Sequence, residues 1–228
     1  MSDVDGAVEG AVRVVLVDDQ QMVRAGFRML VESQPDMVVV GEAGDGQAAL
    51  DLLASTPADV VLMDVRMPVM DGVEATRRIA PGDDGPRVIV LTTFDLDEYA
   101  FEALRSGASA FLLKDATPPD LLGAIRAVHA GDAVVAPSTT RRLLDHFVHE
   151  SATPSVVPEA VLRRLAEVTD REREVLGLIA RGLTNPEIAA TLVVSEATVK
   201  THVGRLLAKT DSRDRVQLVL LALEAGVG

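Results

Sequence analysis

The stretch "VVLMDVRMPVMDG", residues 60–72, decides how the rest of the chain is interpreted. It begins with four apolar residues, as a strand buried on both faces does, and runs directly into Asp64 and later into Asp71 and Gly72. A carboxylate is costly to desolvate, so its place at the end of a buried strand needs a reason. A helix N-cap or a turn is the common reason. A functional carboxylate is the alternative, and the other strands decide between the two.

Composition and charge limit the classes of protein to which the chain can belong. The chain has 228 residues, enough for one large or two modest domains, and no cysteine, which excludes disulfides, thiolate metal sites and cysteine nucleophiles. No apolar run approaches the ~20 residues that span a bilayer, and "MSDVDGAVEG" lacks the regions of a signal peptide, so we expect a cytoplasmic protein without membrane insertion. Residues 1–136 hold 10 Lys and Arg against 23 Asp and Glu, whereas residues 137–228 hold 12 against 12. The two halves therefore have different electrostatic roles.

Four further aliphatic runs resemble the one at 60–64. They cover residues 13–19, 37–43, 87–93 and 110–115. Helical spacing fills the gaps between them, for example at Met22, Phe27, Leu30 and Val31, and a last helix is expected over 119–130. This alternation predicts an open α/β domain with a five-stranded parallel sheet and helices on both faces.

Polar side chains stand where these strands end. Asp18 and Asp19 follow the first strand, Asp64 ends the third, Thr92 the fourth and Lys114 the fifth. The carboxyl ends of parallel strands share one edge, where open α/β folds bind ligands. Three close carboxylates repel one another by several kcal/mol, so one is protonated or a hard cation such as Mg²⁺ sits among them. With lysine and hydroxyl groups beside it, the central carboxylate is placed to attack phosphorus, which predicts an aspartyl phosphate.

The paired aspartates, "DVRMPVMDG", "LTT" and "LLKD" together resemble the receiver domain of bacterial two-component response regulators, over residues 12–131. The resemblance implies a flavodoxin-like strand order and Asp64 as the phosphoacceptor. It implies a Mg²⁺ site made by Asp19 directly, Asp18 through water, Asp64 and the backbone carbonyl of Arg66. Lys114 would bind the phosphoryl group. Thr92 and Phe111 would form the switch pair, with a plain core residue as the alternative for Phe111.

Two other interpretations of this half compete. Phosphatases with an aspartate nucleophile resemble D-x-D-x-[TV], with a second acid two residues after the nucleophile, but Arg66 stands there. A nucleotide site at "GEAGDG" (41–46) would need the spacing G-x-G-x-x-G, which these glycines do not have.

The second half of the chain predicts helices only. A short helix around 139–148 and a Pro- and Ser-containing linker, "ESATPSVVPE" (150–159), come first. "TDRE" (169–172) and "TNPE" (184–187) are capping boxes, and Ser195 caps a third helix. Gly182 suits the end of the first of these helices, and a fourth helix is expected over 213–225.

Two of these helices, joined by a short turn near 193–194, form the frame of a helix-turn-helix. In the second helix Val199, Val203, Leu206 and Leu207 share the core-facing side. The opposite side carries Glu196, Ala197, Lys200, Thr201 and Gly204, flanked by Thr198, His202 and Arg205. We expect Lys200 to reach guanine edges or phosphate, Thr201 to contact bases, and the flanking residues to contact phosphate. Periodicity alone leaves a small helical bundle with a solvated charged face as the alternative.

Residues 165–227 resemble the four-helix LuxR-type DNA-binding domain, with the helix-turn-helix at about 185–204. Thr210 and Gly204 depart from the common pattern, and Gly204 puts some base readout in doubt. A receiver (12–131), a helix and linker (132–164) and this domain (165–228) are the architecture of the NarL/FixJ class. The resemblance implies a DNA-binding transcriptional regulator, not an enzyme beyond self-phosphorylation and slow self-dephosphorylation at Asp64.

The implied partners are a sensor histidine kinase, double-stranded DNA and a second copy of the chain after phosphorylation. Two alternatives stay open. One is a regulator that binds DNA regardless of phosphorylation, against which the complete acidic site counts. The other is a phosphotransfer relay acting only on proteins, against which the helix-turn-helix counts.

Overall fold

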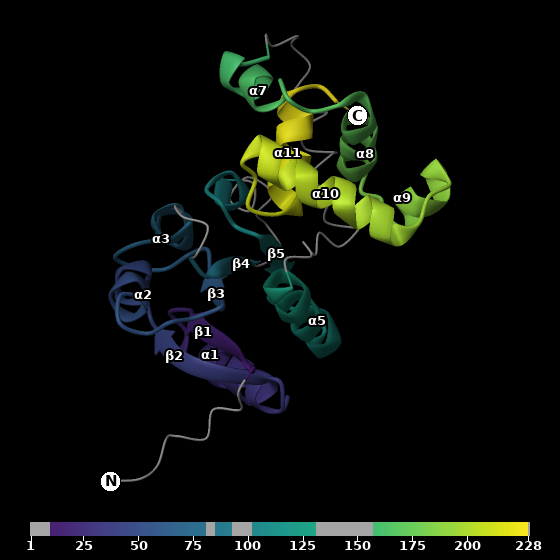
Figure 1. Cartoon of the computed structure of the whole chain (residues 1–228). Coiled ribbons are helices and arrows are strands. Elements are labelled where there is room, and N and C mark those ends of the chain that lie inside the picture. The colour runs from purple at the N-terminus through teal and green to yellow at the C-terminus, as the bar shows by residue number, and fades with distance from the viewer. Residues whose placement is uncertain (1–9, 81–84, 93–101, 131–156, 228) are drawn as a thin grey trace. The chain divides into compact units, whose positions relative to one another are not determined.

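The structure is a computed structural model, which describes residues 10–80, 85–92, 102–130 and 157–227. The chain divides into two compact units, Met1–Val134 and Val135–Gly228. Each unit has its own hydrophobic core, and Figure 1 shows the strands of the first unit and the helices of the second. Within the described ranges, no helix is both long and apolar enough to cross a membrane.

The first unit contains a five-stranded parallel sheet, as the aliphatic runs predicted. Its strands are β1 (Val12–Val17), β2 (Met37–Ala43), β3 (Val60–Asp64), β4 (Arg87–Thr92) and β5 (Ala110–Leu113). Their order in the sheet is β2-β1-β3-β4-β5. The chain runs from β1 to β2 on one side and then returns to β3 on the other, so the topological switch point lies between β1 and β3.

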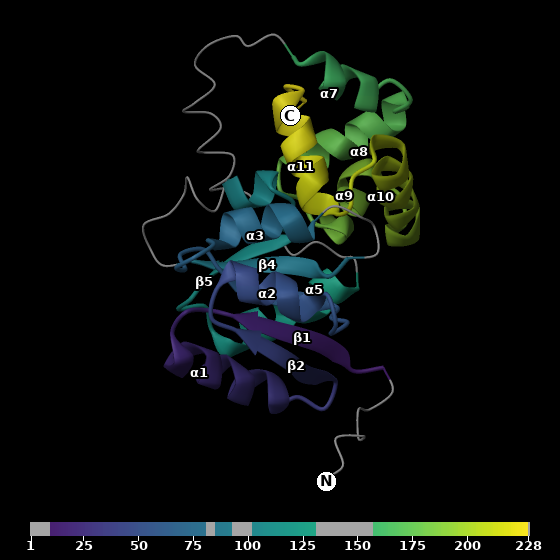
Figure 2. The same ribbon diagram turned by 90° about the vertical axis from the view of Figure 1, so that its left-hand side faces the viewer.

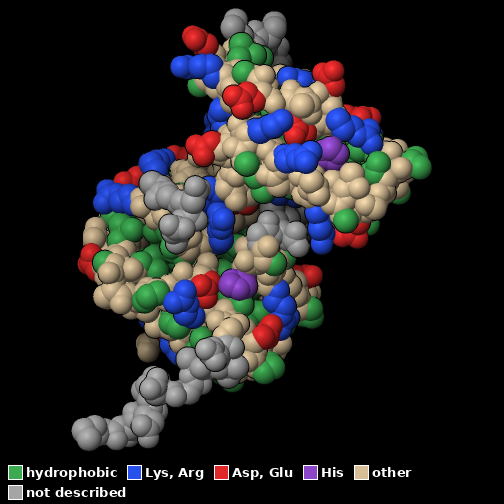
Figure 3. Space-filling model, in the orientation of Figure 1, with side chains coloured by type: hydrophobic (Ala, Val, Ile, Leu, Met, Phe, Trp, Pro, Cys, Tyr) green, Lys and Arg blue, Asp and Glu red, His purple; other side chains and the backbone are tan. Residues whose placement is uncertain are grey.

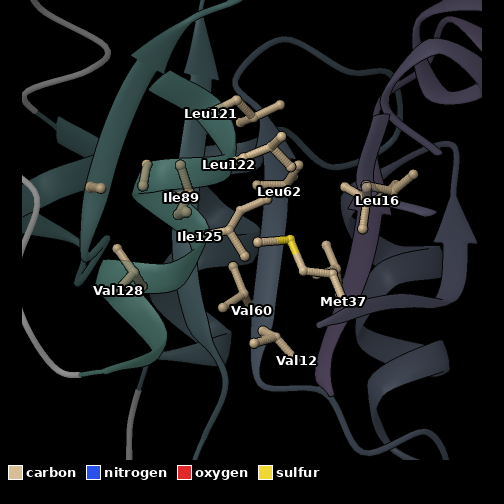
Figure 4. Packing of buried hydrophobic residues seen from close by; sticks show 14 of the residues in the cluster. Val12, Leu16, Met37, Val60, Leu62, Ile89, Leu121, Leu122, Ile125 and Val128 are labelled. Atoms are coloured by element: carbon tan, nitrogen blue, oxygen red, sulfur yellow. The ribbon is translucent and has the colours of Figure 1, made fainter. Parts of the chain in front are cut away.

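Helices cover both faces of this sheet. They are α1 (Gln21–Glu32), α2 (Gly46–Leu53), α3 (Gly72–Ile79) and α5 (Pro118–His129), and residues 102–105 are also helical. α1 and α5 pack on one face, where Leu122 and Ile125 of α5 approach Leu62 and Ile89 of the central strands (Figure 4). Figure 2 views the sheet from its other side, where α2 and α3 lie. The sheet is therefore buried on both faces, which explains its aliphatic strands.

One residue of α1 differs from its prediction. Met22 was expected among the apolar residues that face the sheet, but it is 88% exposed. Phe27, Leu30 and Val31 do pack on the core. Five residues separate Met22 from Phe27, a rotation of roughly 140° around the helix, so the two side chains cannot share one face.

The second unit consists of helices in all its described residues. These are α7 (Glu159–Arg164), α8 (Asp170–Ala180), α9 (Asn185–Leu192), α10 (Glu196–Thr210) and α11 (Arg215–Glu224). Both predicted capping boxes are present, at the starts of α8 and α9. The Ser195 hydroxyl accepts a hydrogen bond from the Thr198 N–H and caps α10, as predicted. Gly182 has a φ of 81°, a value that suits glycine just after the end of α8.

α7 was not predicted from the sequence. This helix begins at Glu159, where the linker was expected to end, and its Val161 and the following Leu165 belong to the core of the second unit. The segment 159–164 is thus part of a packed helix, which adds a fifth helix to the four expected. The helix predicted around 139–148 and the start of the linker lie outside the described residues.

Candidate functional site

The end of β3 is built so that Asp64 faces the carboxyl edge of the sheet. Asp71, not Asp64, is the N-cap of α3: its Oδ1 accepts a hydrogen bond of 2.8 Å from the Glu74 N–H. The Gly72 N–H donates to the Val65 carbonyl, and a Cβ at Gly72 would lie 1.9 Å from the Asp64 carbonyl oxygen. Only glycine fits there. Asp64 is therefore free of the capping role that would have explained it most simply.

Three carboxylates gather at this edge. Asp18 and Asp19 follow β1, Asp64 ends β3, and one oxygen of each lies within 4.8 Å of the others. Asp18 and Asp64 are 1% and 5% exposed, whereas Asp19 is exposed. Lys114, just after β5, places its Nζ 2.7 Å from Asp18 Oδ2 and 2.9 Å from Asp64 Oδ2. The four predicted charged groups therefore do converge.

Burial and charge oppose each other at this cluster. Burial raises the pKa of Asp64 above its ordinary value, and the hydrogen bond and charge of Lys114 offset only part of that rise. For Lys114, burial alone would lower the pKa, but its contacts with Asp18 and Asp64 outweigh it, so the pKa lies above the ordinary value. The lysine therefore stays charged beside the carboxylates.

The donor set suits a hard cation. Asp18 Oδ1 accepts a hydrogen bond of 2.8 Å from the Gln20 N–H. Its Oδ2 is fully buried and contacts the Lys114 ammonium without receiving a well-aligned hydrogen bond. A buried carboxylate oxygen with such incomplete hydrogen bonding, beside an exposed second carboxylate, fits oxygen-ligated Mg²⁺. Across the described ranges, this is the only group of three or more acidic or histidine side chains placed to hold a metal.

The remaining predicted residues of this half lie near the same edge. Thr92 ends β4, is 2% exposed, and its carbonyl accepts a hydrogen bond of 2.8 Å from the Lys114 N–H. The Arg66 N–H donates to the Asp64 carboxylate, while the Arg66 residue itself is exposed. Phe111 is buried on β5, beside Val90 of β4, which suits both a core residue and an inward-turned switch residue.

Two contacts to the cluster escaped the sequence analysis. One is the main-chain N–H of Gln20, described above. The other is Arg24 of α1, whose Nη1 donates a hydrogen bond of 2.5 Å to the Asp18 carbonyl oxygen. The spacing of six residues between Asp18 and Arg24 carries no signal of its own, because the contact depends on how the loop before α1 turns back.

In the second unit, α10 presents the predicted polar face. Val199 and Leu206 are buried and Val203 and Leu207 half-buried, as predicted for its core side. The opposite side is exposed, at Glu196, Ala197, Thr198, Lys200, Thr201, Gly204 and Arg205. His202 differs in part: it is half-buried, and its Nδ1 is buried without a hydrogen-bond partner, so only the other ring nitrogen is left for phosphate. Lys200 Nζ lies 3.6 Å from Glu196 Oε1.

The comparisons with known proteins agree with both units. Residues 14–126 match the response regulator receiver domain family, and residues 166–222 match the LuxR family of bacterial regulatory proteins. The chain therefore belongs to the two-component response regulators that join a receiver to a LuxR-type DNA-binding domain, the class the sequence analysis predicted.

Full-length relatives share this architecture. The chain is 44% identical to the transcriptional regulatory protein YxjL of Bacillus subtilis, over 95% of this chain and 97% of that protein. It is 36% identical to the nitrate/nitrite response regulator NarL of Escherichia coli K12, over 90% and 91% of the two chains. Among solved structures, the response regulator RcsB in complex with DNA is similar, with a TM-score of 0.55, 25% identity, and coverage of 92% and 97%.

Proposed function

We propose that Mg²⁺-dependent phosphorylation of Asp64 by a sensor histidine kinase switches this transcriptional regulator. The observation that carries the proposal is the convergence of Asp18, Asp19 and Asp64 with Lys114 at the switch point of the sheet. The domains that perform the two tasks would be residues 12–131 and 165–228, with α7 packed on the second.

Each group then has a role in the transfer. Asp64 Oδ attacks phosphorus, the bond from phosphorus to the donor's nitrogen or oxygen breaks, and the donor leaves with that electron pair. Bound Mg²⁺ would screen the phosphoryl oxygens, held by Asp19, Asp64, the Arg66 carbonyl and, through water, Asp18. Lys114 moves its charge from the carboxylates to a phosphoryl oxygen, and the Thr92 hydroxyl donates to another. Thr92 and Phe111 would pass the change to the surface.

The output would be DNA binding by α10 in a dimer. Lys200 would contact guanine edges or phosphate, Thr201 would contact base edges with Ala197 beside it, and Glu196 would shape their readout. Thr198, Arg205 and the outer nitrogen of His202 would contact phosphate. The complex of RcsB with DNA supports this use of the second unit. Acidic and basic side chains are interspersed on the visible face of that unit (Figure 3), so a single copy should bind weakly and two copies are needed.

The test is the intact mass of the protein after incubation with acetyl phosphate and Mg²⁺, beside Asp64→Ala. One phosphoryl adduct that requires Mg²⁺ and is absent from the variant is the expected result. An adduct on the variant would move the site elsewhere. No adduct on either protein, also with purified histidine kinases as donors, would favour the regulator that acts without phosphorylation.

A further inference from the structure

We propose that Arg24 is a positioning residue, which holds the segment carrying Asp18 and Asp19 in the geometry that the metal requires. The inference rests on the proposed function, since it concerns the same acidic cluster. It assigns a role to a residue of α1 that contacts the main chain of the cluster and is braced by a carboxylate of another strand.

Arg24 reaches back from α1 to the end of β1. Its Nη1 donates to the Asp18 carbonyl oxygen at 2.5 Å, and its Nε lies 3.1 Å from Glu42 Oε2 of β2. The side chain of Arg24 is only 17% exposed. Its guanidinium also lies over Gly44, where a Cβ would be 4.0 Å from Nη1. One planar group thus joins the loop after β1 to the strand beside it.

Other contacts at this loop hold Asp18 itself. The Asp18 N–H donates to the Ala43 carbonyl at 3.2 Å, its carboxylate accepts from the Gln20 N–H, and Lys114 Nζ lies 2.7 Å from its Oδ2. Asp19 is exposed, and its direction follows from the main chain at Asp18. Charge-assisted hydrogen bonds such as that of Arg24 are stronger than neutral ones, and supporting contacts of this kind typically change metal affinity 10- to 100-fold when removed.

Arg28 provides a matched comparison on the same helix. Its Nε lies 2.6 Å from Glu42 Oε1, the other oxygen of the carboxylate that braces Arg24. It also pairs with Glu32 at 2.6 Å. Among the described residues, the side-chain hydrogen bonds of Arg28 are to these two carboxylates. Substituting Arg28 therefore removes the same charge and perturbs the same glutamate, but spares the contact to the loop.

The direction in which Mg²⁺ affinity changes distinguishes a positioning role of Arg24 from a simple effect of its charge. If Arg24 acted only as a positive charge near a cation site, Arg24→Ala would tighten Mg²⁺ binding, because a like charge is removed. If it positions the loop, the same change weakens binding. Arg24→Lys keeps the charge but lacks the fork that reaches two acceptors, so it should recover only part of the affinity.

The experiment is a calorimetric titration of the unphosphorylated full chain with Mg²⁺, for wild type, Arg24→Ala, Arg24→Lys and Arg28→Ala. Thermal unfolding of each variant checks the fold, and Arg24→Lys, which keeps the charge and loses the fork, carries the comparison if Arg24→Ala does not fold. We expect the Mg²⁺ dissociation constant to rise about tenfold for Arg24→Ala and less than twofold for Arg28→Ala.

Equal or tighter binding by Arg24→Ala would overturn the inference, and so would equal weakening by both alanine variants. The adduct measurement on wild type distinguishes the two proposals. If the wild type forms the adduct and Arg24→Ala binds Mg²⁺ as tightly as the wild type does, only the positioning role is wrong. If the wild type neither binds Mg²⁺ nor forms the adduct, both the positioning role and the proposed function are wrong.

Discussion

Val69 adopts a backbone conformation that its side chain disfavours. It follows Met67 and Pro68 in the loop after Asp64, has a φ of 66°, and is 87% exposed. Left-handed conformations cost L-residues roughly 1–2 kcal/mol, and β-branched residues adopt them least readily. An exposed side chain gains little burial to offset this cost. Val193, in the turn before α10, has a φ of 54° and is 89% exposed, so the same argument holds there.

Replacing Val69 with asparagine should therefore stabilise the first unit. Asparagine tolerates the left-handed region, so we expect a gain of about 1 kcal/mol, or a rise in Tm of about 3 °C. Calorimetric unfolding of the full chain measures it. Val69→Thr is the matched control, because threonine is also β-branched and keeps the unfavourable backbone. An equal rise with threonine would mean that replacing an exposed apolar side chain with a polar one, not relief of the backbone, explains the gain.

The site residues that could be predicted from the sequence are those that stand at equivalent positions of regular elements, such as the ends of strands. Asp18, Asp64 and Lys114 were predicted as a cluster because each ends a strand, and parallel strands end at one edge. The contact of Arg24 could not be predicted, since it depends on the conformation of a long side chain across a loop. Met22 was predicted wrongly, because an apolar side chain faces the core of a helical layer only if its angular position around the helix places it there.

At the scale of elements, Glu172 joins α8 to α10. Its Oε2 accepts from the N–H and the hydroxyl of Thr169 at 2.9 Å and lies 2.7 Å from Lys209 Nζ. Burial opposes the charge of this carboxylate, but Lys209 and Thr169 outweigh it and lower the pKa to about 2. The ordinary value is 4.5, so the ionised form contributes at most about 3 kcal/mol to stability, less after solvent screening at Lys209.

The contribution of ionised Glu172 to stability should decrease as the pH is lowered. Because the folded pKa is depressed, the contribution is complete above about pH 4.5 and is lost as the pH falls toward 2. Glu172→Gln should lower the Tm of the second unit near pH 7, and the difference from wild type should shrink by pH 3. Glu187→Gln alters the other capping box, where Glu187 accepts from the Thr184 N–H, and should have a smaller effect because Glu187 is exposed. A difference that stays constant with pH would contradict the linkage.

The ion pair of Lys200 and Glu196 leads to a prediction about DNA binding by α10. Both side chains are more than half exposed, so their contact at 3.6 Å contributes little to folding. Glu196 nevertheless holds a negative charge at the edge that would face DNA. Glu196→Gln should tighten binding to mixed-sequence duplex DNA several-fold at low salt, measured by fluorescence anisotropy, whereas Lys200→Ala should weaken it and reduce the salt slope by about 1.

Glu159→Gln on α7 is the charge-matched control, since it removes one negative charge from an exposed residue of another helix in the same unit. If it tightens DNA binding as much as Glu196→Gln, net charge and not the place of Glu196 explains the change.

Helices with a strong start signal were predicted well. Thr169, Thr184 and Ser195 each cap a helix through the side chain, and α8, α9 and α10 begin where those caps predicted. α7 has six residues and begins after Pro158, which offers no side-chain cap. Its stability comes from packing of residues such as Val161 against the rest of the unit, and such tertiary contacts are not visible in local sequence.

At the scale of the whole molecule, the charge is divided unevenly between the units. The excess of acidic over basic residues lies within residues 1–136, and residues 137–228 are neutral. A DNA-binding unit without net positive charge gains little from overall electrostatic attraction to DNA, so a single copy should bind weakly. If phosphorylated chains pair as proposed, two copies would double the contacts, which would account for DNA binding by a chain with a net charge of −13.

Phosphorylation should therefore change oligomeric state and DNA affinity together. With beryllofluoride and Mg²⁺ as a stable substitute for the phosphoryl group, light scattering should show the mass doubling from one chain to two, and Asp64→Ala should stay unchanged. Selection from a randomised duplex pool with the activated protein should yield paired half-sites about one helical turn apart, with a steeper salt dependence than for the inactive protein. A dimer of equal stability without beryllofluoride, binding the same sites equally well, would instead make the receiver a permanent dimerisation scaffold, whose acidic cluster serves something other than the switch.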